Sequence, residues 1–158
     1  MAGEEIKLRR AGAADASAVR QLTHEAYAKW IPRIGREPRP MTADHDAAVR
    51  DHRVDLLYVA GDLAALIETI DQGDRLLVEN LAVAPGHQRR GLGTLLLSHA
   101  EDIATALGFD LIWLYTNRRF EGNVALYSRL GYRIDSEEVI EGGSVRVNMS
   151  KTVAPAPR

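Results

Sequence analysis

The most informative segment of the chain is Leu81-Ala-Val-Ala-Pro-Gly-His-Gln-Arg-Arg-Gly-Leu-Gly-Thr94. The apolar run that ends in Leu81-Ala-Val83 predicts a buried strand, and Pro85-Gly86 predicts a turn directly after it. Two arginines and Gly91-Leu-Gly93 follow, and then a pattern that predicts a helix. Glycines let backbone amides approach a ligand closely, and a helix N-terminus adds unpaired N–H groups and about half a positive charge. The stretch therefore predicts a loop that binds a phosphate or pyrophosphate.

Three kinds of nucleotide-binding loop compete for this pattern. A Walker A loop needs Lys and then Ser or Thr after its second glycine, but Leu92 and Gly93 stand there. A Rossmann fingerprint needs a third glycine or alanine, where this chain has Leu96, and no βαβ unit opens the chain. The third pattern, Gln/Arg-x-x-Gly-x-Gly/Ala, is present as Gln88-Arg-Arg-Gly91-Leu-Gly93. It resembles the acetyl-CoA pyrophosphate loop of the GCN5-related N-acetyltransferase (GNAT) family.

Outward from this loop, hydrophobic periodicity predicts the remaining elements. Strands are expected at residues 6–10, 54–60, 63–70, 76–84, 109–115, 132–140 and 145–151. The turn between the second and third strands is expected at Gly61-Asp62, and the continuous apolar strand 109–115 is expected to be buried. Helices are expected at 15–30, from an N-cap at Thr42 to about residue 50, at 91–107 and at 123–130. Ala18 is expected on the apolar face of the first of these helices, and Leu107 on that of helix 91–107, which Gly108 is expected to end. Residues 31–40 hold three prolines and a glycine and are expected to form a loop. The order β-α-α-β-β-β-α-β-α-β-β predicts an α/β fold with one mixed sheet and helices on both faces.

Length and composition exclude several classes of protein. The 158 residues predict one domain, residues 1–152, followed by a flexible tail at 153–158 that contains two prolines. Twenty Lys+Arg against twenty-two Asp+Glu argue against binding to nucleic acid or to an anionic membrane. The chain has no cysteine, and none of its five histidines form an i, i+4 pair, so no metal site is expected. With no signal peptide and no apolar span, a cytoplasmic protein is expected, and a homodimer is left open.

The resemblance to the GNAT family extends from about Leu76 to Tyr132. After the loop, the family has a strand, a short helix containing Asn and a Tyr-x-x-x-Gly-Phe/Tyr ending. This chain has residues 109–115, then Asn123-Val-Ala-Leu-Tyr127, then Gly131-Tyr132. The resemblance implies acetyl-CoA as co-substrate and N-acetyl transfer to a primary amine, by direct attack while both substrates are bound.

The same resemblance implies the residues that bind acetyl-CoA. The pyrophosphate is expected on the backbone N–H groups of the loop residues Gln88, Arg89, Arg90, Gly91, Gly93 and Thr94. Leu81 and Val83 are expected to offer main-chain groups to pantetheine, because in the family their strand splays away from its parallel neighbour, here residues 109–115. Asn123 is expected to contact CoA. Asn117 is a weaker candidate that could instead only form a turn.

Two residues are candidates for the chemistry. Tyr127 lies four residues after Asn123 and so shares its helix face, and its family position implies a general acid that protonates the CoA thiolate. The alternative is a half-buried core aromatic. Glu79 places a charge in an apolar strand, which is costly unless the charge is paired or functional. It is a candidate for the base that deprotonates the amine, for an acceptor contact, or for hydrogen-bonded structure, whereas Asn80 points the other way and is expected to be structural.

The acceptor is expected to be a small molecule or a peptide that carries an amine. Acceptor pockets of the family implicate Tyr27, Trp30, Arg33 and Met41, together with Arg36 and Arg39. The positive charge of residues 29–39 is compatible with an acceptor that also carries a carboxylate or phosphate, or with a solvated loop. A non-catalytic CoA-binding or sensing module on the same fold is the main alternative, and a protein-modifying toxin of this fold is a third.

Overall fold

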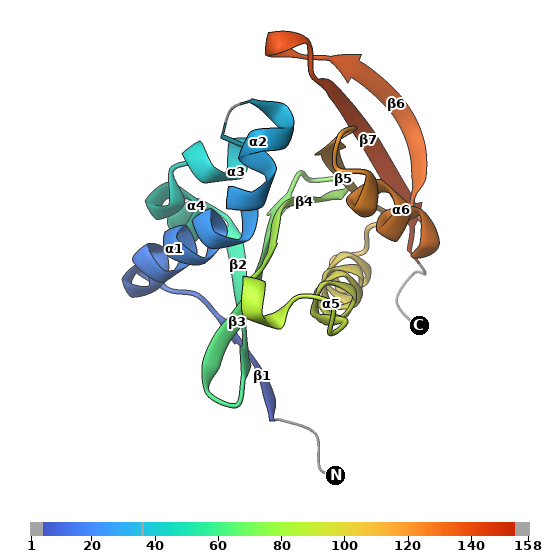
Figure 1. The fold of residues 1–158 in the computed structure, drawn as a ribbon. Coiled ribbons are helices and arrows are strands. Elements are labelled where there is room, and N and C mark those ends of the chain that lie inside the picture. The colour runs from blue at the N-terminus through green and yellow to red at the C-terminus, as the bar shows by residue number, and fades with distance from the viewer. Residues whose placement is uncertain (1–4, 36, 154–158) are drawn as a thin grey trace. The chain divides into compact units, whose positions relative to one another are not determined.

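The computed structural model describes residues 5–35 and 37–153 (Figure 1). In this part of the chain the strands are β1 (Ile6–Arg10), β2 (Arg53–Val59), β3 (Asp62–Asp71), β4 (Leu76–Val83), β5 (Leu111–Asn117), β6 (Arg133–Val139) and β7 (Val145–Thr152). The helices are α1 (Ala16–Tyr27), α2 (Ile31–Ile34), α3 (Arg39–Thr42), α4 (His45–Asp51), α5 (Leu92–Ala106) and α6 (Glu121–Arg129). The strands form a mixed sheet in the order β1-β2-β3-β4-β5-β7-β6. The predicted fold class is confirmed, and the predicted order of elements differs in that α2 and α3 lie between the two helices expected after β1.

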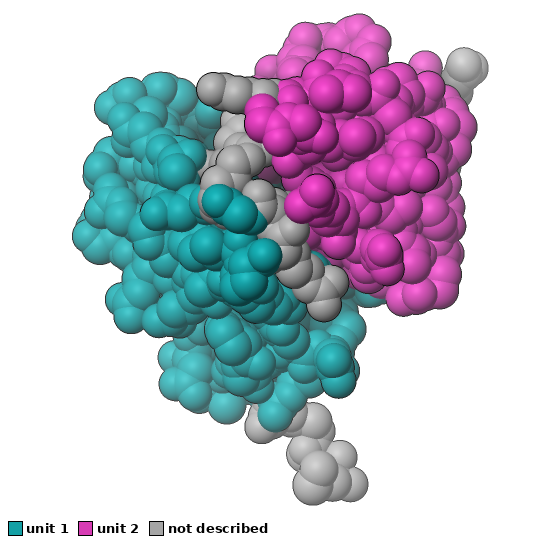
Figure 2. All heavy atoms as spheres, turned by 45° about the horizontal axis from the view of Figure 1, so that its top comes forward, with its two compact units in different colours: residues 1–69, 80–97 teal, residues 70–79, 98–158 magenta. Residues whose placement is uncertain are grey.

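The chain divides into two compact units, shown in Figure 2. Unit 1 contains the chain up to Thr69 and residues 80–97, and unit 2 contains residues 70–79 and the chain from Ser98 onward. The chain passes from one unit to the other within β3, β4 and α5. The single domain expected over residues 1–152 stays a prediction.

Unit 1 opens with an antiparallel meander. β1 pairs with β2, and β2 pairs with β3. The turn between β2 and β3 was expected at Gly61-Asp62, but Asp62 already pairs with Val59. Ala60 (φ 50°) and Gly61 (φ 87°) form the turn instead. Two successive residues with positive φ give the tight hairpin turn whose twist matches that of the flanking strands.

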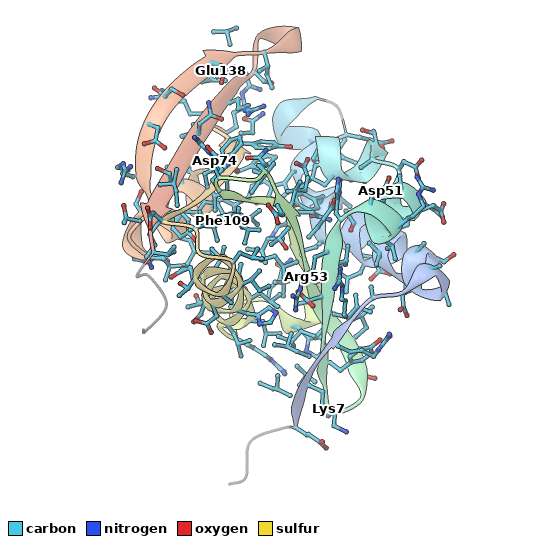
Figure 3. The ribbon with its side chains drawn as sticks, turned by 180° about the vertical axis from the view of Figure 1, so that it is seen from behind. Lys7, Asp51, Arg53, Asp74, Phe109 and Glu138 are labelled. Atoms are coloured by element: carbon cyan, nitrogen blue, oxygen red, sulfur yellow. The ribbon has the colours of Figure 1, made fainter. Side chains whose placement is uncertain are left out.

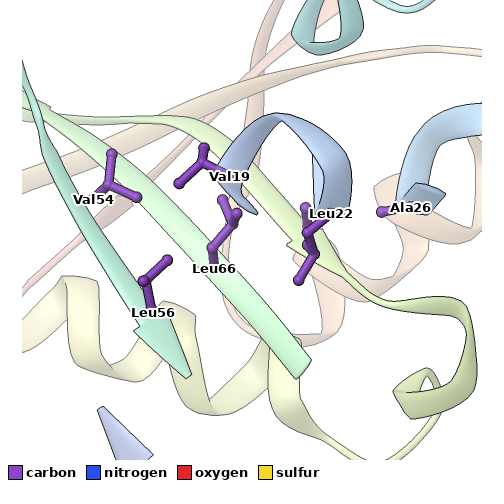
Figure 4. Close-up of a cluster of buried hydrophobic side chains, with 7 residues drawn as sticks. Val19, Leu22, Ala26, Val54, Leu56 and Leu66 are labelled. Atoms are coloured by element: carbon purple, nitrogen blue, oxygen red, sulfur yellow. The ribbon is translucent and has the colours of Figure 1, made fainter. Parts of the chain in front are cut away.

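Helix α1 closes the core of unit 1 (Figure 4). Its buried residues Val19, Leu22 and Ala26 pack against side chains of β2, β3 and β4, namely Val54, Leu56, Leu66 and Ala82. Ala18 was expected on this face but is exposed. The apolar stripe runs through Val19 instead, because positions i, i+3 and i+7 lie on one side of a helix.

The expectation of an irregular loop over residues 31–40 is wrong in part, because α2 and α3 are single helical turns. Proline is tolerated in the first turn of a helix, where its missing N–H has no intrahelical partner, and Pro32 and Pro40 occupy such positions. Gly35, with φ 72°, ends α2. Asp44, not Thr42, is the N-cap of α4, and its carboxylate accepts a hydrogen bond from the Ala47 N–H at 3.0 Å.

Unit 2 is built around β5. β4 pairs with it in parallel, Leu76–Val78 against Ile112–Leu114, and β7 pairs with it in antiparallel fashion on the other side. β6 then pairs with β7 as an antiparallel hairpin (Figure 1). The last hydrogen bond of this sheet region joins the Val153 N–H to the Asp110 carbonyl at 2.8 Å. Val153 is therefore held, while the rest of the expected tail, 154–158, lies outside the described residues.

The two faces of the unit 2 sheet differ in character. β5 was expected to be buried throughout, but its burial alternates from residue to residue. On one face, Val145 and Val147 line a hollow of about 640 Å³ together with Val124 and Ala125 of α6. Side chains of the other face are polar or aromatic, and they are Trp113, Tyr115, Asn117, Arg146 and Asn148. Figure 3 shows Glu138 on β6, which is paired with Arg146 and so belongs to this second face.

Helix α5 ends close to its predicted boundary. Gly108 adopts φ 82° just beyond it, as expected for a residue that terminates a helix. Leu107 was expected on the buried face but is 47% exposed, because the helix has already ended at Ala106. Within the described ranges, the helices are all too short or too polar to cross a bilayer.

Candidate active site

The backbone of the loop between β4 and α5 is shaped to receive an anion. Gly91 has φ 78°, and Arg89 also takes the left-handed conformation, with φ 64°. The Leu95 N–H donates to the Gly91 carbonyl at 3.0 Å, so the N–H groups of residues 92–94 come before the first carbonyl partners of the helix. A Cβ at Gly91 would meet no atom within 4 Å. Open space therefore lies beside unpaired helix N–H groups, as phosphate binding requires.

Gln88 holds this loop in place through its side chain. Its Nε2 donates to the Val83 carbonyl at 3.0 Å, and its Oε1 accepts from Lys29 Nζ at 2.9 Å. The Gln88 side chain thus ties the loop to the end of β4 and to the segment after α1. Arg89 and Arg90 are exposed. This arrangement favours backbone N–H groups over the Gln88 side chain as the anion ligands.

The outer edge of β4 in unit 1 carries the main-chain groups of Leu81 and Val83. The Ala84 N–H donates to Ala64 of β3 at 2.8 Å, and main-chain groups alternate along a strand, so Leu81 and Val83 face away from β3. The carbonyl of Leu81 accepts from the Tyr27 hydroxyl at 2.9 Å, and that of Val83 accepts from Gln88. Their N–H groups are consequently the better candidates for pantetheine. The splay of β4 from β5 stays a prediction.

The residues expected to contact the acceptor do not share one environment. Tyr27 is half-buried and bound to Leu81 as described, and the Trp30 ring lies under Lys29 Nζ, 5.1 Å from the ring centroid. Met41 is buried, and its carbonyl lies 2.7 Å from His24 Nε2. Arg36 and the side chains of Arg33 and Arg39 lie outside the described residues. Tyr27 and Trp30 thus remain the stronger acceptor candidates.

In unit 2, Tyr127 lies on α6 one turn after Asn123. Its ring is buried and meets the Tyr132 ring edge-on, with 6.1 Å between the centroids. Burial raises the pKa of Tyr127 to about 12, because the phenolate would lose its hydration. The hydroxyl therefore stays protonated at neutral pH and has a proton to give.

Glu79 makes a contact that the sequence did not reveal. The Tyr115 hydroxyl donates to Glu79 Oε1 at 2.6 Å, so the charge in the apolar strand is compensated. The Arg146 guanidinium lies over the Tyr115 ring, 4.1 Å from its centroid. Tyr115 and Arg146 belong to β5 and β7, far along the chain from Glu79, and no local pattern connects them. The alternation of polar residues along β5 and β7 is the one signal that could have singled them out.

Two asparagines make structural contacts. The Asn117 Oδ1 accepts from the Arg119 N–H at 2.9 Å, which is the turn-forming role weighed as its alternative. Asn80 is buried in unit 1, where its Nδ2 donates to Thr23 Oγ1 at 3.2 Å. Across residues 5–35 and 37–153, the structure shows no cluster of three or more His, Asp or Glu side chains that could hold a metal ion.

Together, the mixed sheet, the glycine loop between β4 and α5 and the short helix after β5 define the acetyltransferase class of fold. The ribosomal-protein-S18-alanine N-acetyltransferase from Escherichia coli superposes with a TM-score of 0.79 at 22% identity, covering 98% of this chain and 97% of that one. The PaiA N-acetyltransferase from Thermoplasma acidophilum, solved in complex with coenzyme A, gives a TM-score of 0.70 at 18% identity, covering 94% and 99%. The chain belongs to the acetyltransferase (GNAT) family, whose model matches residues 18–132. The predicted family is confirmed.

Curated relatives are similar over a shorter region. Streptothricin acetyltransferase of Streptomyces lavendulae is 35% identical over 74 residues, which are 46% of this chain and 39% of the relative. The [Ribosomal protein bS18]-alanine N-acetyltransferase of Escherichia coli (strain K12) is 36% identical over 72 residues, 46% of this chain and 49% of the relative. The chain thus matches less than half the length of each.

Proposed function

We propose that the protein is an N-acetyltransferase that moves an acetyl group from acetyl-CoA to a primary amine. The observation that carries the proposal is the loop from Gln88 to Thr94, with its left-handed Gly91, open space at the Cβ position and unpaired helix N–H groups. Membership of the GNAT family supports acetyl-CoA as the donor. The relatives are named for the acetylation of streptothricin and of an alanine of ribosomal protein bS18, so a small molecule and a protein are both candidate acceptors.

In the proposed reaction the neutral amine attacks the thioester carbonyl directly. The acceptor arrives as an ammonium ion and gives a proton to Glu79. Glu79 Oε1 already accepts from Tyr115, so Oε2 is the oxygen proposed to receive it. As the C–S bond breaks, the acceptor nitrogen loses its second proton to solvent, and Tyr127 donates its hydroxyl proton to the CoA thiolate and regains one from solvent. Glu79 then releases its proton to solvent, so that one proton is released for each acetyl group transferred. In unit 1, the loop N–H groups bind the pyrophosphate and the Leu81 and Val83 N–H groups bind pantetheine.

An acceptor screen tests this proposal. Acetyl-CoA is offered with streptothricin, with a hexapeptide that begins with alanine, and with simple primary amines, while free thiol release is followed. Thermal melts with CoA run in parallel. Thiol release that depends on one amine, and is lost in Glu79→Gln at neutral pH, supports the proposal. A CoA-dependent rise in melting temperature without turnover of any amine would instead favour the non-catalytic CoA-binding module.

The location of the protein, its independence of a metal ion and its partners are also proposals. A cytoplasmic location and a reaction without a metal ion fit the composition of the chain, which lacks cysteine. A homodimer and the absence of nucleic-acid and membrane partners are likewise proposed, and size-exclusion chromatography with light scattering tests the first of these.

A further inference from the structure

We propose that Tyr115 is a positioning residue that holds the Glu79 carboxylate ready for proton transfer. This inference rests on the proposed function only for the catalytic role of Glu79. Its structural basis is the hydrogen bond from the Tyr115 hydroxyl to Glu79 Oε1, 2.6 Å long, between two half-buried side chains of unit 2. A short bond to an ionised acceptor is stronger than one between neutral groups.

Contacts with side chains of β7 and β6 fix the position of Tyr115. The Arg146 guanidinium stacks on its ring at 4.1 Å, and Arg146 Nε donates to Asn148 Oδ1 at 2.8 Å. Asn148 is buried, and its Nδ2 donates to Ser136 Oγ at 3.0 Å and to Glu138 Oε1 at 2.6 Å. The contacts thus run from β6 through β7 and β5 to Glu79 on β4. They fix the plane of the tyrosine ring and with it the direction of its hydroxyl.

This arrangement leaves the two carboxylate oxygens of Glu79 unequal. Oε1 is occupied by Tyr115, so a proton from an ammonium group is received at Oε2. Among the described residues of unit 2, the Arg146 guanidinium on β7 lies over the Tyr115 ring, and Glu138 on β6 is paired with Arg146. The tyrosine is the group in direct contact, so its removal is expected to give the largest change.

The first experiment follows Glu79 without any acceptor. Protein labelled with 13C at the glutamate carboxyl carbons is titrated by NMR, and the Glu79 signal is assigned from its absence in Glu79→Gln. In Tyr115→Phe the titration midpoint of Glu79 is expected to rise, because the ionised form loses a hydrogen-bond donor. Tyr58→Phe is the matched control, since it also removes a hydroxyl with one hydrogen bond, here from Arg9 at 2.8 Å, but in unit 1. It is expected to leave the midpoint unchanged.

The second experiment is a double-mutant cycle on kcat/KM with acetyl-CoA and whichever of streptothricin or the alanine hexapeptide is turned over. Tyr115→Phe is expected to lower kcat/KM about tenfold and to move the acid limb of the pH profile upward. In the Glu79→Gln background it is expected to have no further effect, because its target is gone. Equal losses in both backgrounds would overturn the inference.

Failure of the inference and failure of the proposed function give different results. If wild-type protein acetylates no amine of the screen, the proposed function is in error and the NMR titration alone decides about Tyr115. An unchanged Glu79 midpoint in folded Tyr115→Phe overturns the inference whatever the activity. Arg146→Met is a second variant that keeps the tyrosine hydroxyl but removes the stacked cation. Its midpoint is expected to rise by less than that of Tyr115→Phe, and a larger rise would contradict the assignment.

Discussion

Replacing Gly91 by glutamate separates the anion-binding role of the loop from its structural role. Gly91 has φ 78°, and a side chain in this conformation costs about 1–2 kcal/mol. No atom lies within 4 Å of the added Cβ, so there is no clash to add to this cost. For a chain of this length, about 2–4 °C is lost per kcal/mol, and the melting temperature should fall by roughly 2–8 °C. The variant is therefore expected to fold.

The assay is a thermal melt with increasing CoA. At a CoA concentration 100-fold above its dissociation constant, the wild type should gain about 2.7 kcal/mol, or roughly 5–10 °C. In Gly91→Glu a carboxylate stands beside the first N–H groups of α5 and repels the pyrophosphate, so this rise should disappear.

Gly108→Glu is the matched control for this experiment. Gly108 has φ 82° and open space at its Cβ position, but it lies beyond the other end of α5. Gly108→Glu should therefore lose a similar amount of stability, plus about 0.3–1 kcal/mol for a negative charge at a helix C-terminus, and keep the full CoA response. A folded Gly91→Glu that shows the wild-type response to CoA would refute the assignment of the phosphate loop.

Three further predictions concern the general acid, a turn and an ion pair. Tyr127→Phe should keep CoA affinity within a few-fold and lower kcat about 10- to 1000-fold. Because the pKa of Tyr127 is raised to about 12, the kcat of the wild type should show no loss from tyrosine ionisation below about pH 10. An unaltered kcat in Tyr127→Phe, with chemistry as the rate-limiting step, would exclude Tyr127 as the general acid. Ala60→Asn should raise the melting temperature by about 2–4 °C, because asparagine tolerates the φ of 50° better than alanine, and a lower melting temperature would contradict this. Arg9 holds the pKa of Asp15 at about 2 through a two-pronged ion pair, so the pair should stabilise the fold above pH 4 and lose this effect as the pH falls from 4 to 2. Urea unfolding of Arg9→Gln and wild type should then differ at pH 6 and converge near pH 2, whereas a constant difference would show that the pair is not responsible.

The sequence was sufficient where the physics is local. The periodicity of apolar residues identified the strands and the long helices, because burial of one face demands a fixed spacing. The loop was predictable for the same reason, since glycines, a turn and a helix start within fourteen consecutive residues determine the direction of backbone N–H groups. The four-residue spacing of Asn123 and Tyr127 likewise placed them on one side of α6, because residues four apart are neighbours on a helix surface.

Local rules failed where two of them compete. The three prolines of residues 31–40 suggested a loop, yet Pro32 and Pro40 lie in first turns, where a proline costs a helix nothing. Thr42 and Asp44 are both good N-cap residues, and only the hydrogen bond from Ala47 distinguishes them. In each case the sequence is compatible with both local structures, and the packing of the segment determines which of them forms.

The pairing of side chains from distant strands was decided by the tertiary structure alone. Glu79 could be recognised as an unusual charge in an apolar strand, but its partner Tyr115 lies 36 residues further on and was expected to be buried. Tyr27 meets the Leu81 carbonyl across 54 residues. The insertion of β7 between β5 and β6, which brings Arg146 over Tyr115, follows from the order of strands and not from any residue pattern. Periodicity states which face of a strand is buried, but the neighbour across the sheet is chosen by the packing of the whole chain, and that choice determines which group holds the candidate base.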